Sequence, residues 1–227
     1  MKHVVVTRAY FEDDALFESY YKTMKEVYFP SLGAQTNSNF NLLIHANERH
    51  CSSIIQELNK HGIKNYSVAP DIKNIEHRCM EYNIQTRHDC DDYMGPTYVE
   101  KIQNAYITNI MNCDTFIVYA VGTKYDLKTK SEYTIPNATI PTSPECTAVA
   151  GMGFLSVCQK FPKIWVYQTS HQSLVKLVPD IIYIQEYGIV RWVIHGSNKM
   201  GKIRPRDKMY KMSDNIDLFP RSNMLAN

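Results

Sequence analysis

The chain has 227 residues, of which 44% are hydrophobic and 21% are charged, and its formal net charge is +2. This composition excludes an intrinsically disordered chain and suits an α/β protein with a substantial core. The small net charge gives no argument for binding nucleic acid or an anionic membrane surface.

The six cysteines show neither a CxxC pair nor a metal-like spacing. We therefore expect free thiols in a reducing compartment and predict a cytoplasmic protein. No apolar segment approaches the roughly 20 residues that a membrane-spanning helix needs, so we expect no membrane span.

The first half of the chain alternates strand-like and helix-like patterns. Asp13 and Asp14 are typical of a helix start, and Pro30 predicts the end of that helix. We expect residues 71–77 to be a connector. The other predicted elements are strands at 4–6, 40–44 and 66–69 and a helix at 52–58.

The second half continues this alternation. A strand at 84–86 leads into an acidic turn, and residues 98–111 form a predicted amphipathic helix. Residues 125–135 are expected to form a hairpin or a loop, and further strands are predicted at 115–120, 164–167, 181–184 and 192–195. The pattern indicates an α/β fold with a mainly parallel central sheet and helices on both faces. We assign residues 1–212 to this domain and residues 213–227 to a C-terminal tail.

The acidic turn holds three aspartates within four positions, Asp89, Asp91 and Asp92. Grouped carboxylates repel one another and lose hydration unless a cation lies among them. Oxygen ligands on a short turn favour Mg²⁺, Mn²⁺ or Ca²⁺ over zinc. The alternative is a solvated turn in which Asp92 starts the next helix.

Three polar groups follow predicted strands: Thr7 with Arg8, the acidic turn, and His195. In sheets of this kind, ligands bind beyond the carboxyl ends of the strands, so these groups are candidates for one site. The alternative is that polar residues simply terminate strands. A P-loop or a dinucleotide-binding turn is disfavoured, because neither glycine motif follows the first strand.

At the family level, the acidic turn resembles the DxD signature of GT-A glycosyltransferases. The ordered motifs resemble the "TR-x-D-x-DD", "PSL…Q…F" and "H-G-x-N" segments of a rhamnosyltransferase family, and a Val-Val-Thr-Arg opening also fits. In this chain they stand at residues 86–92, at 30–32 with Gln35 and Phe40, at 195–198 and at 5–8. The matches span about residues 3–205. The compact size is also similar to that of virus-encoded glycosyltransferases that decorate capsid glycans, which implies the host cytoplasm.

The resemblance implies a single GT-A (Rossmann-like) domain, a UDP- or dTDP-sugar donor, and Mn²⁺ or Mg²⁺ as cofactor. It implies that Asp91 is the main metal ligand, that Asp89 faces the ribose or the metal, and that His195 is a third ligand. Asp92 would orient the donor sugar or an adjacent arginine, and Arg87 would contact the donor.

The same resemblance implies that four further side chains contact the donor. Thr7 and Arg8 would lie near the base and ribose, and Lys199 and Lys202 would reach the diphosphate. The lysines depart from the "HxxGxxKPW" element of some retaining enzymes in spacing and in lacking Trp, which leaves their assignment open. The structural alternatives are a buried or capping histidine at 195 and a solvated basic face at the lysines.

On the acceptor side, the candidates for a base that deprotonates a hydroxyl are Asp92, Glu145 and Glu186. We expect transfer of a hexose or rhamnose to a glycan or glycoprotein. One alternative is a metal-dependent nucleotidyl or phosphoryl transferase, because that chemistry also needs a neutralised diphosphate. The other is a non-catalytic nucleotide-sugar binder. The sequence leaves open whether the reaction inverts or retains the anomeric centre.

Overall fold

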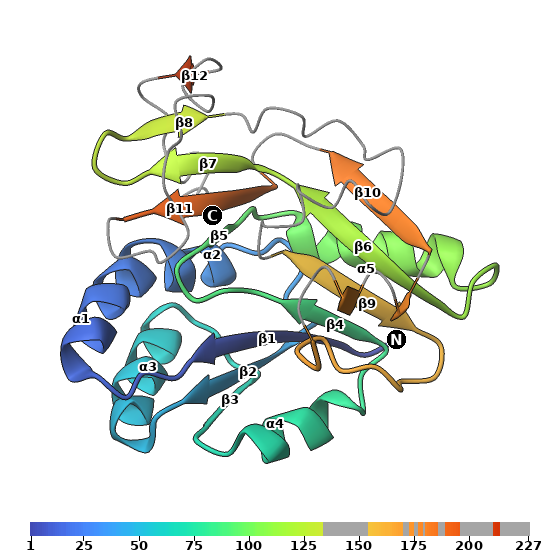
Figure 1. Cartoon of the computed structure of the whole chain (residues 1–227), viewed down its shortest axis with the longest axis horizontal. Coiled ribbons are helices and arrows are strands. Elements are labelled where there is room, and N and C mark those ends of the chain that lie inside the picture. The colour runs from blue at the N-terminus through green and yellow to red at the C-terminus, as the bar shows by residue number, and fades with distance from the viewer. Residues whose placement is uncertain are drawn as a thin grey trace, which may run out of the picture.

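A seven-stranded sheet forms the centre of the chain (Figure 1). In this computed structural model, residues 1–133, 154–169, 173–174, 177–178, 180–185, 189–195 and 211–213 are described. Across the sheet the strands are β10 (Ile181–Gln185), β6 (Thr115–Val121), β9 (Leu155–Gln159), β4 (Ile84–Arg87), β1 (His3–Ala9), β2 (Asn41–Ala46) and β3 (Tyr66–Ala69). All neighbours are parallel except β9, which is antiparallel to both β4 and β6. The predicted α/β class is confirmed.

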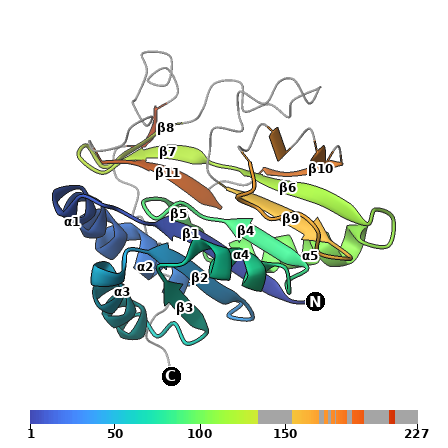
Figure 2. The ribbon, with the colours of Figure 1, turned by 60° about the horizontal axis from the view of Figure 1, so that its bottom comes forward.

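Both faces of this sheet are covered (Figure 2). Val5 of β1 packs on one face in a cluster that includes Ile54, whereas Val4 and Val6 pack on the other with Ile75. Helices α1 (Asp14–Thr23), α2 (Phe29–Gly33), α3 (Glu48–Lys60) and α5 (Tyr98–Asn109) contribute to the first cluster, and α4 (Ile72–Cys79) contributes to the second. A strand buried on both faces is a continuous apolar run, and the start of β1 has this character.

A second, smaller sheet lies beyond the carboxyl ends of β4 and β6. Its order is β12 (Lys211–Ser213), β8 (Ser131–Tyr133), β7 (Thr123–Asp126), β11 (Val190–Ile194) and β5 (Tyr93–Met94). The chain passes from β6 to β7 through the single residue Gly122, and from β4 to β5 through the acidic turn. β7 and β8 form a hairpin, which is one of the two alternatives predicted for residues 125–135, and residues 134–135 lie outside the described part of the chain. The second sheet therefore joins the acidic turn to the strand that leads to His195.

Three helices begin at side-chain caps. The carboxylate of Asp13 accepts the N–H groups of Ala15 and Leu16, Asn47 caps α3, and Asp71 caps α4. These caps satisfy N–H groups that lack a partner in the first turn of a helix. The expectation of a connector at 71–77 is wrong, because Asp71 starts a helix there.

The predicted helix end at Pro30 is also wrong. α1 continues through a π-helical turn (Met24–Tyr28) into α2, and Pro30 lies in the first turn of α2. A proline removes one hydrogen bond of the helix and crowds the preceding turn, and the π-helical turn lies just before Pro30, where such a disturbance is accommodated.

Residues 164–167 do not form the predicted strand. The side-chain oxygen of Gln159 accepts the N–H groups of Lys163 and Ile164, at 2.9 and 2.8 Å, and Gln85 accepts the N–H of Val166 at 3.1 Å. Two glutamine side chains therefore bind the backbone groups that a neighbouring strand would otherwise pair. The strand β9, just before this segment, was not predicted.

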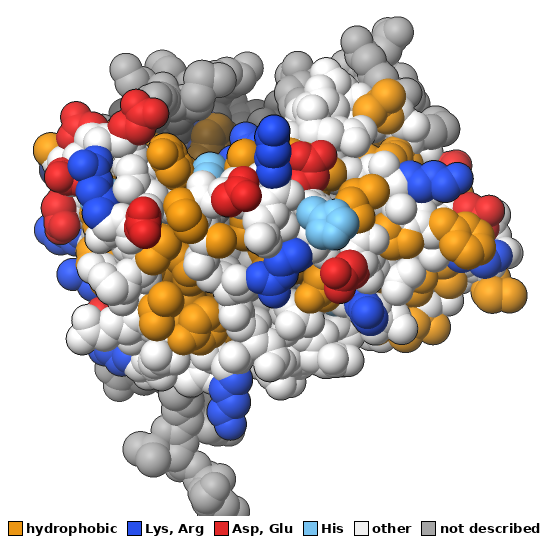
Figure 3. Space-filling view, turned by 90° about the horizontal axis from the view of Figure 1, so that it is seen from below, with side chains coloured by type: hydrophobic (Ala, Val, Ile, Leu, Met, Phe, Trp, Pro, Cys, Tyr) orange, Lys and Arg blue, Asp and Glu red, His pale blue; other side chains and the backbone are white. Residues whose placement is uncertain are grey.

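On the face shown in Figure 3, acidic and basic side chains are interspersed, and no large patch of one sign covers the part drawn in colour. Among the residues that the structure describes, no helix is long and apolar enough to cross a membrane. The five described cysteines are free thiols. The domain boundary predicted after residue 212 falls within β12, and the division stays a prediction.

Candidate active site

Hydrogen bonds to β1, within the turn and from the His88 ring fix the acidic turn. The N–H of His88 donates to the carbonyl of Val6 on β1, and the N–H of Asp92 donates to the carbonyl of Asp89. The ring Nε2–H of His88 donates to the carbonyl of Asp92 at 3.2 Å. Burial lowers the pKa of His88 to about 3, so this imidazole is a neutral donor beneath the turn. The alternative in which Asp92 starts a helix is wrong, because β5 follows the turn and α5 begins at Tyr98.

Asp91 meets His195 in the structure. Oδ2 of Asp91 lies 3.1 Å from Nε2 of His195, although the two residues are 104 positions apart in the chain. Tyr20 of α1 stands edge-on to the His195 ring, with 4.9 Å between ring centroids. Burial, and secondarily the charge of Asp91, raise the pKa of Tyr20 to about 12. Two of the three polar groups that were predicted at strand ends are therefore in direct contact, although β4 and β11 belong to different sheets.

Asp89 turns toward a different partner. Its Oδ1 accepts a hydrogen bond from Nε of Arg87 at 3.2 Å. Desolvation raises the pKa of Asp89, and the charge of Arg87 opposes that shift. In this arrangement Asp89 orients Arg87, while Asp91 faces His195.

Asp92 lies inside the protein and is 2% exposed. Its Oδ1 accepts the backbone N–H of Val193 in β11 at 3.0 Å. Burial, with smaller contributions from Asp91 and Asp89, raises the pKa of Asp92 well above its usual range. The three carboxyl groups of one short turn therefore have three different environments.

Two arginines and two aromatic rings lie beside the turn. The guanidinium carbons of Arg8 and Arg87 each lie 4.5 Å from the centre of the Tyr167 ring, and that of Arg8 lies 5.5 Å from the Trp165 ring. The Tyr167 hydroxyl donates to the carbonyl of Val6 at 3.3 Å, which fixes the ring. Sequence reasoning missed both aromatic residues because it assigned them to a strand.

A stacked pair stands at the carboxyl ends of β1 and β2. The rings of Tyr10 and His45 are 4.7 Å apart and inclined by 16°, and Tyr10 is 43% exposed. Nε2–H of His45 donates to the carbonyl of Pro70 at 3.1 Å. The pair was not predicted, although both residues follow apolar strand runs and the same strand-end argument applies to them.

Other predicted site residues stand apart from this cluster or cannot be assigned to it. Thr7 is fully buried, and its hydroxyl accepts the Tyr28 hydroxyl at 2.7 Å, so the structure does not bring this side chain to the surface. Arg8, the next residue, is exposed. Four predicted residues lie outside the described part of the chain: Glu145, Glu186, Lys199 and Lys202.

The donor set can be tested against a divalent cation. Among the described residues, no group of three or more His, Cys, Asp or Glu side chains is arranged as a metal site. Asp91 and His195 offer two donor atoms 3.1 Å apart. Adjacent ligands of an octahedral ion at about 2.1 Å lie roughly 3 Å from each other, so the pair fits two neighbouring positions. Such ions are commonly held by one or two protein carboxylates together with substrate phosphates, so a partial protein shell is compatible with one.

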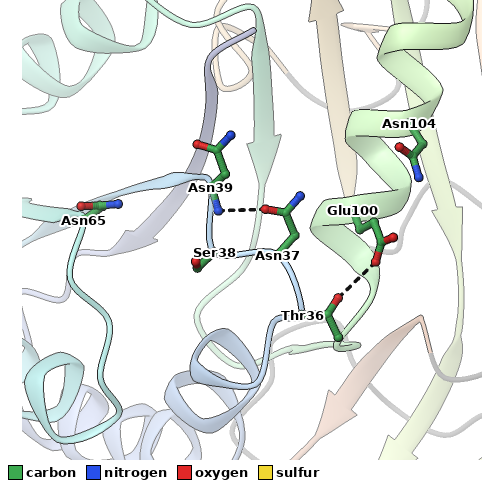
Figure 4. Close-up of a pocket in the computed structure, with 7 residues that line it drawn as sticks. All are labelled: Thr36, Asn37, Ser38, Asn39, Asn65, Glu100 and Asn104. Carbon is green, nitrogen blue, oxygen red and sulfur yellow. Dashed lines mark hydrogen bonds between the residues drawn. The ribbon is translucent and has the colours of Figure 1, made fainter.

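A hollow of about 710 Å³ lies elsewhere on the molecule (Figure 4). It lies beside the start of β2 and the first turns of α5, so it is at the amino end of β2, whereas the acidic turn follows the carboxyl end of β4. The residues that line it are Thr36, Asn37, Ser38, Asn39, Asn65, Glu100 and Asn104. No Lys or Arg lines it, so it is not suited to a diphosphate.

Comparisons with known proteins identify the fold. No family model matches the sequence, and no curated protein matches it. The crystal structure of S. aureus TarS 1–349 matches 85% of this chain with a TM-score of 0.52 and 11% identity. Its complex with UDP matches 86% with a TM-score of 0.51 and 12% identity. The chain spans 60–61% of the length of those structures. The likeness therefore shows a shared fold and nothing further.

Proposed function

We propose that the chain is a metal-dependent glycosyltransferase. It moves a sugar, a hexose or rhamnose, from a UDP- or dTDP-sugar to a glycan or glycoprotein acceptor. The observation that carries this proposal is the pairing of Asp91 with His195 beside Arg8 and Arg87, at the carboxyl ends of the strands. TarS, which shares the fold, is crystallised in complex with UDP, and this supports a nucleotide-sugar donor.

The nucleotide is bound by groups that surround the turn. The exposed Tyr10 ring, stacked on the half-buried His45 ring, offers an aromatic surface to the base. The charge of Arg8 acts on both His45 and Asp89, so this arginine would lie between the base and the diphosphate. Arg87 is held by Asp89 and by the Tyr167 ring, which fixes a second positive charge for the phosphates.

Asp91 and His195 would hold Mn²⁺ or Mg²⁺. When bound there, the cation neutralises the negative charge that develops on the departing nucleoside diphosphate. Lys199 and Lys202 add positive charge for the same diphosphate, and Glu145 deprotonates the acceptor hydroxyl; both assignments are proposals from the sequence. The free thiols among the described cysteines support a reducing compartment such as the cytoplasm.

The first test is ligand-dependent thermal stability, which needs no acceptor. A ligand at a hundredfold excess over its Kd stabilises the folded state by about 2.7 kcal/mol, and each kcal/mol raises the Tm of a chain this size by about 2–4 °C. UDP or dTDP with Mn²⁺ should therefore raise the Tm by about 5–11 °C. Either component alone should have a much smaller effect, and EDTA should abolish the shift.

Asp91→Asn is the matched variant for this test. It keeps the size of the side chain, removes one ligand charge and reduces repulsion within the turn, so the fold should survive while the shift disappears. An equal nucleotide shift in the presence of EDTA would contradict a metal-bridged donor. Incubation with labelled nucleotide sugars then separates the functions by product: sugar on an acceptor, nucleotide on an acceptor, or neither.

A further inference from the structure

The hydrogen bond from Val193 to Asp92 joins the acidic turn to the strand that leads to His195. Val193 precedes His195 by two residues, and its N–H donates to Oδ1 of Asp92 at 3.0 Å. Asp92 is adjacent to Asp91, whose Oδ2 contacts His195. Both interactions therefore connect the acidic turn with the segment that begins in β11. Their residues are one position apart on the turn and two positions apart on that segment.

The pairing of β5 with β11 shows why a side chain is needed here. β5 is antiparallel to β11 and pairs only Met94 with Val190 and Tyr93 with Arg191. Beyond Arg191, the chain on the β5 side has turned into the acidic turn and offers no strand partner. The Asp92 carboxylate replaces that partner and accepts the next available N–H group. It extends the hydrogen bonding of β11 toward the end that carries His195.

The surroundings of Asp92 do not suit a base that acts on an acceptor. A general base must come within hydrogen-bond reach of the hydroxyl that it deprotonates. Asp92 is 2% exposed, and Oδ1 is already bound to the backbone of β11. Asp91, by contrast, is directed at His195.

We propose that Asp92 is a positioning residue, which holds β11 so that His195 stays against Asp91. The inference rests on the proposed function, in which Asp91 and His195 would hold the cation. It requires a hydrogen-bond acceptor at position 92 and does not require a negative charge there. This requirement separates it from a role as metal ligand or as catalytic base.

Two substitutions test the requirement. Asp92→Ala removes the acceptor, whereas Asp92→Asn keeps an oxygen that can accept the Val193 N–H and removes the charge. Loss of a residue that orients a metal ligand typically lowers metal affinity by about 10–100-fold. We expect the affinity for Mn²⁺ in the presence of UDP, measured by calorimetry, to fall by about that factor in Asp92→Ala. In Asp92→Asn, which keeps the acceptor, the fall should be smaller than about tenfold.

Gln103→Ala is the matched control. Gln103 of α5 is also buried, and its side chain also binds a distant backbone group, the carbonyl of Asn39, at 2.8 Å. This variant creates the same kind of defect away from β11 and from the acidic turn. It should lower stability without lowering Mn²⁺ affinity, which excludes a general loss of structure as the cause.

A metal-free measurement keeps this inference separate from the proposed function. In the absence of any ligand, the His195 imidazole resonances should shift, and the Val193 amide should exchange faster, in Asp92→Ala but not in Asp92→Asn. If the wild-type protein binds no Mn²⁺, the proposed function fails. The comparison of the His195 resonances and the Val193 exchange between the two variants then still tests the positioning role of Asp92. If Asp92→Ala does not fold, protection of the Val193 amide in Asp92→Asn still tests the acceptor role. Wild-type behaviour in Asp92→Ala, or an Asp92→Asn variant as impaired as Asp92→Ala, would overturn the proposal.

Discussion

At the scale of single residues, the three aspartates of the acidic turn show how environment divides identical side chains into different roles. Asp89 pairs with Arg87, Asp91 contacts His195, and Asp92 is buried against the backbone of β11. A cluster of carboxylates in a sequence indicates a cation but does not say which member faces it. Burial and partner decide that, and both depend on strands that lie far away in the chain.

Arg8 is the residue whose change should affect nucleotide binding most directly. It is exposed, and its guanidinium lies over the Tyr167 and Trp165 rings. Arg8→Met keeps a long apolar side chain and removes the charge. A hydrogen bond to a charged group contributes about 1.5–3 kcal/mol, so UDP affinity in the presence of Mn²⁺ should fall by about 10–100-fold.

Lys60→Met is the control for that experiment. Lys60 is an exposed cation in the last turn of α3, where it pairs with Glu57. The substitution changes the net charge of the protein by the same amount as Arg8→Met. Equal losses of UDP affinity in the two variants would show a general charge effect and contradict a specific role for Arg8.

The sequence made Asp91 and His195 candidates for one site but did not predict the contacts of Thr7. The two residues meet although β4 belongs to the larger sheet and β11 to the smaller one, because the smaller sheet lies beyond the carboxyl end of β4. The sequence could not show which side chain of β1 reaches solvent. β1 is covered on both faces, so its apolar run carries no alternation, and Thr7 proved to be buried while Arg8 is exposed.

At the scale of elements, β11 is the strand on which the site depends. It pairs with β7 in parallel, and Arg191 forms a buried ion pair with Glu132 of β8, with 3.1 Å between Nε and Oε1. The position of His195 is therefore set by the smaller sheet, whereas the aspartates lie on the turn between β4 of the larger sheet and β5 of the smaller one. Displacement of β11 relative to this turn should separate the Asp91–His195 pair.

Gly122 offers a test of that dependence. A Cβ atom at this position would overlap the carbonyl oxygen of Val190 in β11. Gly122→Ala should therefore push β11 away from the junction of β6 with β7. Overpacking of this kind costs about 1–3 kcal/mol in the free energy of unfolding. We expect that loss in urea denaturation together with weaker Mn²⁺ binding.

Gly62→Ala is the matched control for Gly122→Ala. Gly62 follows α3 and has a φ of +71°, so an alanine is strained there. The methyl group of that alanine would nevertheless meet no neighbouring atom within 4 Å. This variant should lose stability and keep its Mn²⁺ affinity. Normal Mn²⁺ affinity in Gly122→Ala as well would show that β11 does not need this close approach.

Helices and strands could be predicted from the sequence where the local apolar pattern matched the hydrogen bonding of the folded chain, and not elsewhere. The runs at β2, β3 and β6 were predicted as strands and are strands. The apolar run at 164–167 was mistaken for a strand because its backbone groups bind the side chains of Gln159 and Gln85. A pattern of apolar residues reports burial, but the hydrogen-bond partners of the backbone come from distant residues.

At the scale of the whole molecule, buried histidines link stability to pH. His3 donates from Nε2 to the hydroxyl of Thr86 at 2.8 Å and accepts from Gln103 at Nδ1 at 3.4 Å. Thr86 in turn pairs with Ser156, so a polar network crosses the core beneath the acidic turn. Burial lowers the pKa of His3 to about 3, and the pKa of His88 likewise to about 3.

The direction of the pH dependence follows from these pKa values. The unfolded chain binds protons at these histidines below about pH 6.5, whereas the folded chain does so only near pH 3. Between those values the unfolded state takes up more protons, so stability falls as the pH falls. Each histidine contributes up to about 1.4 kcal/mol per pH unit to that slope.

His3→Gln should remove one of these contributions. Urea unfolding at pH 7, 6, 5 and 4 would measure it, with the exposed His77→Gln as control. At pH 7 the His3→Gln variant should be less stable than wild type, because its core network is disturbed. As the pH falls below about 6.5, the difference should shrink by up to about 1.4 kcal/mol per unit, since only the wild type loses stability through His3. Parallel pH profiles for His3→Gln and wild type would show that His3 is not the buried neutral group that the network requires.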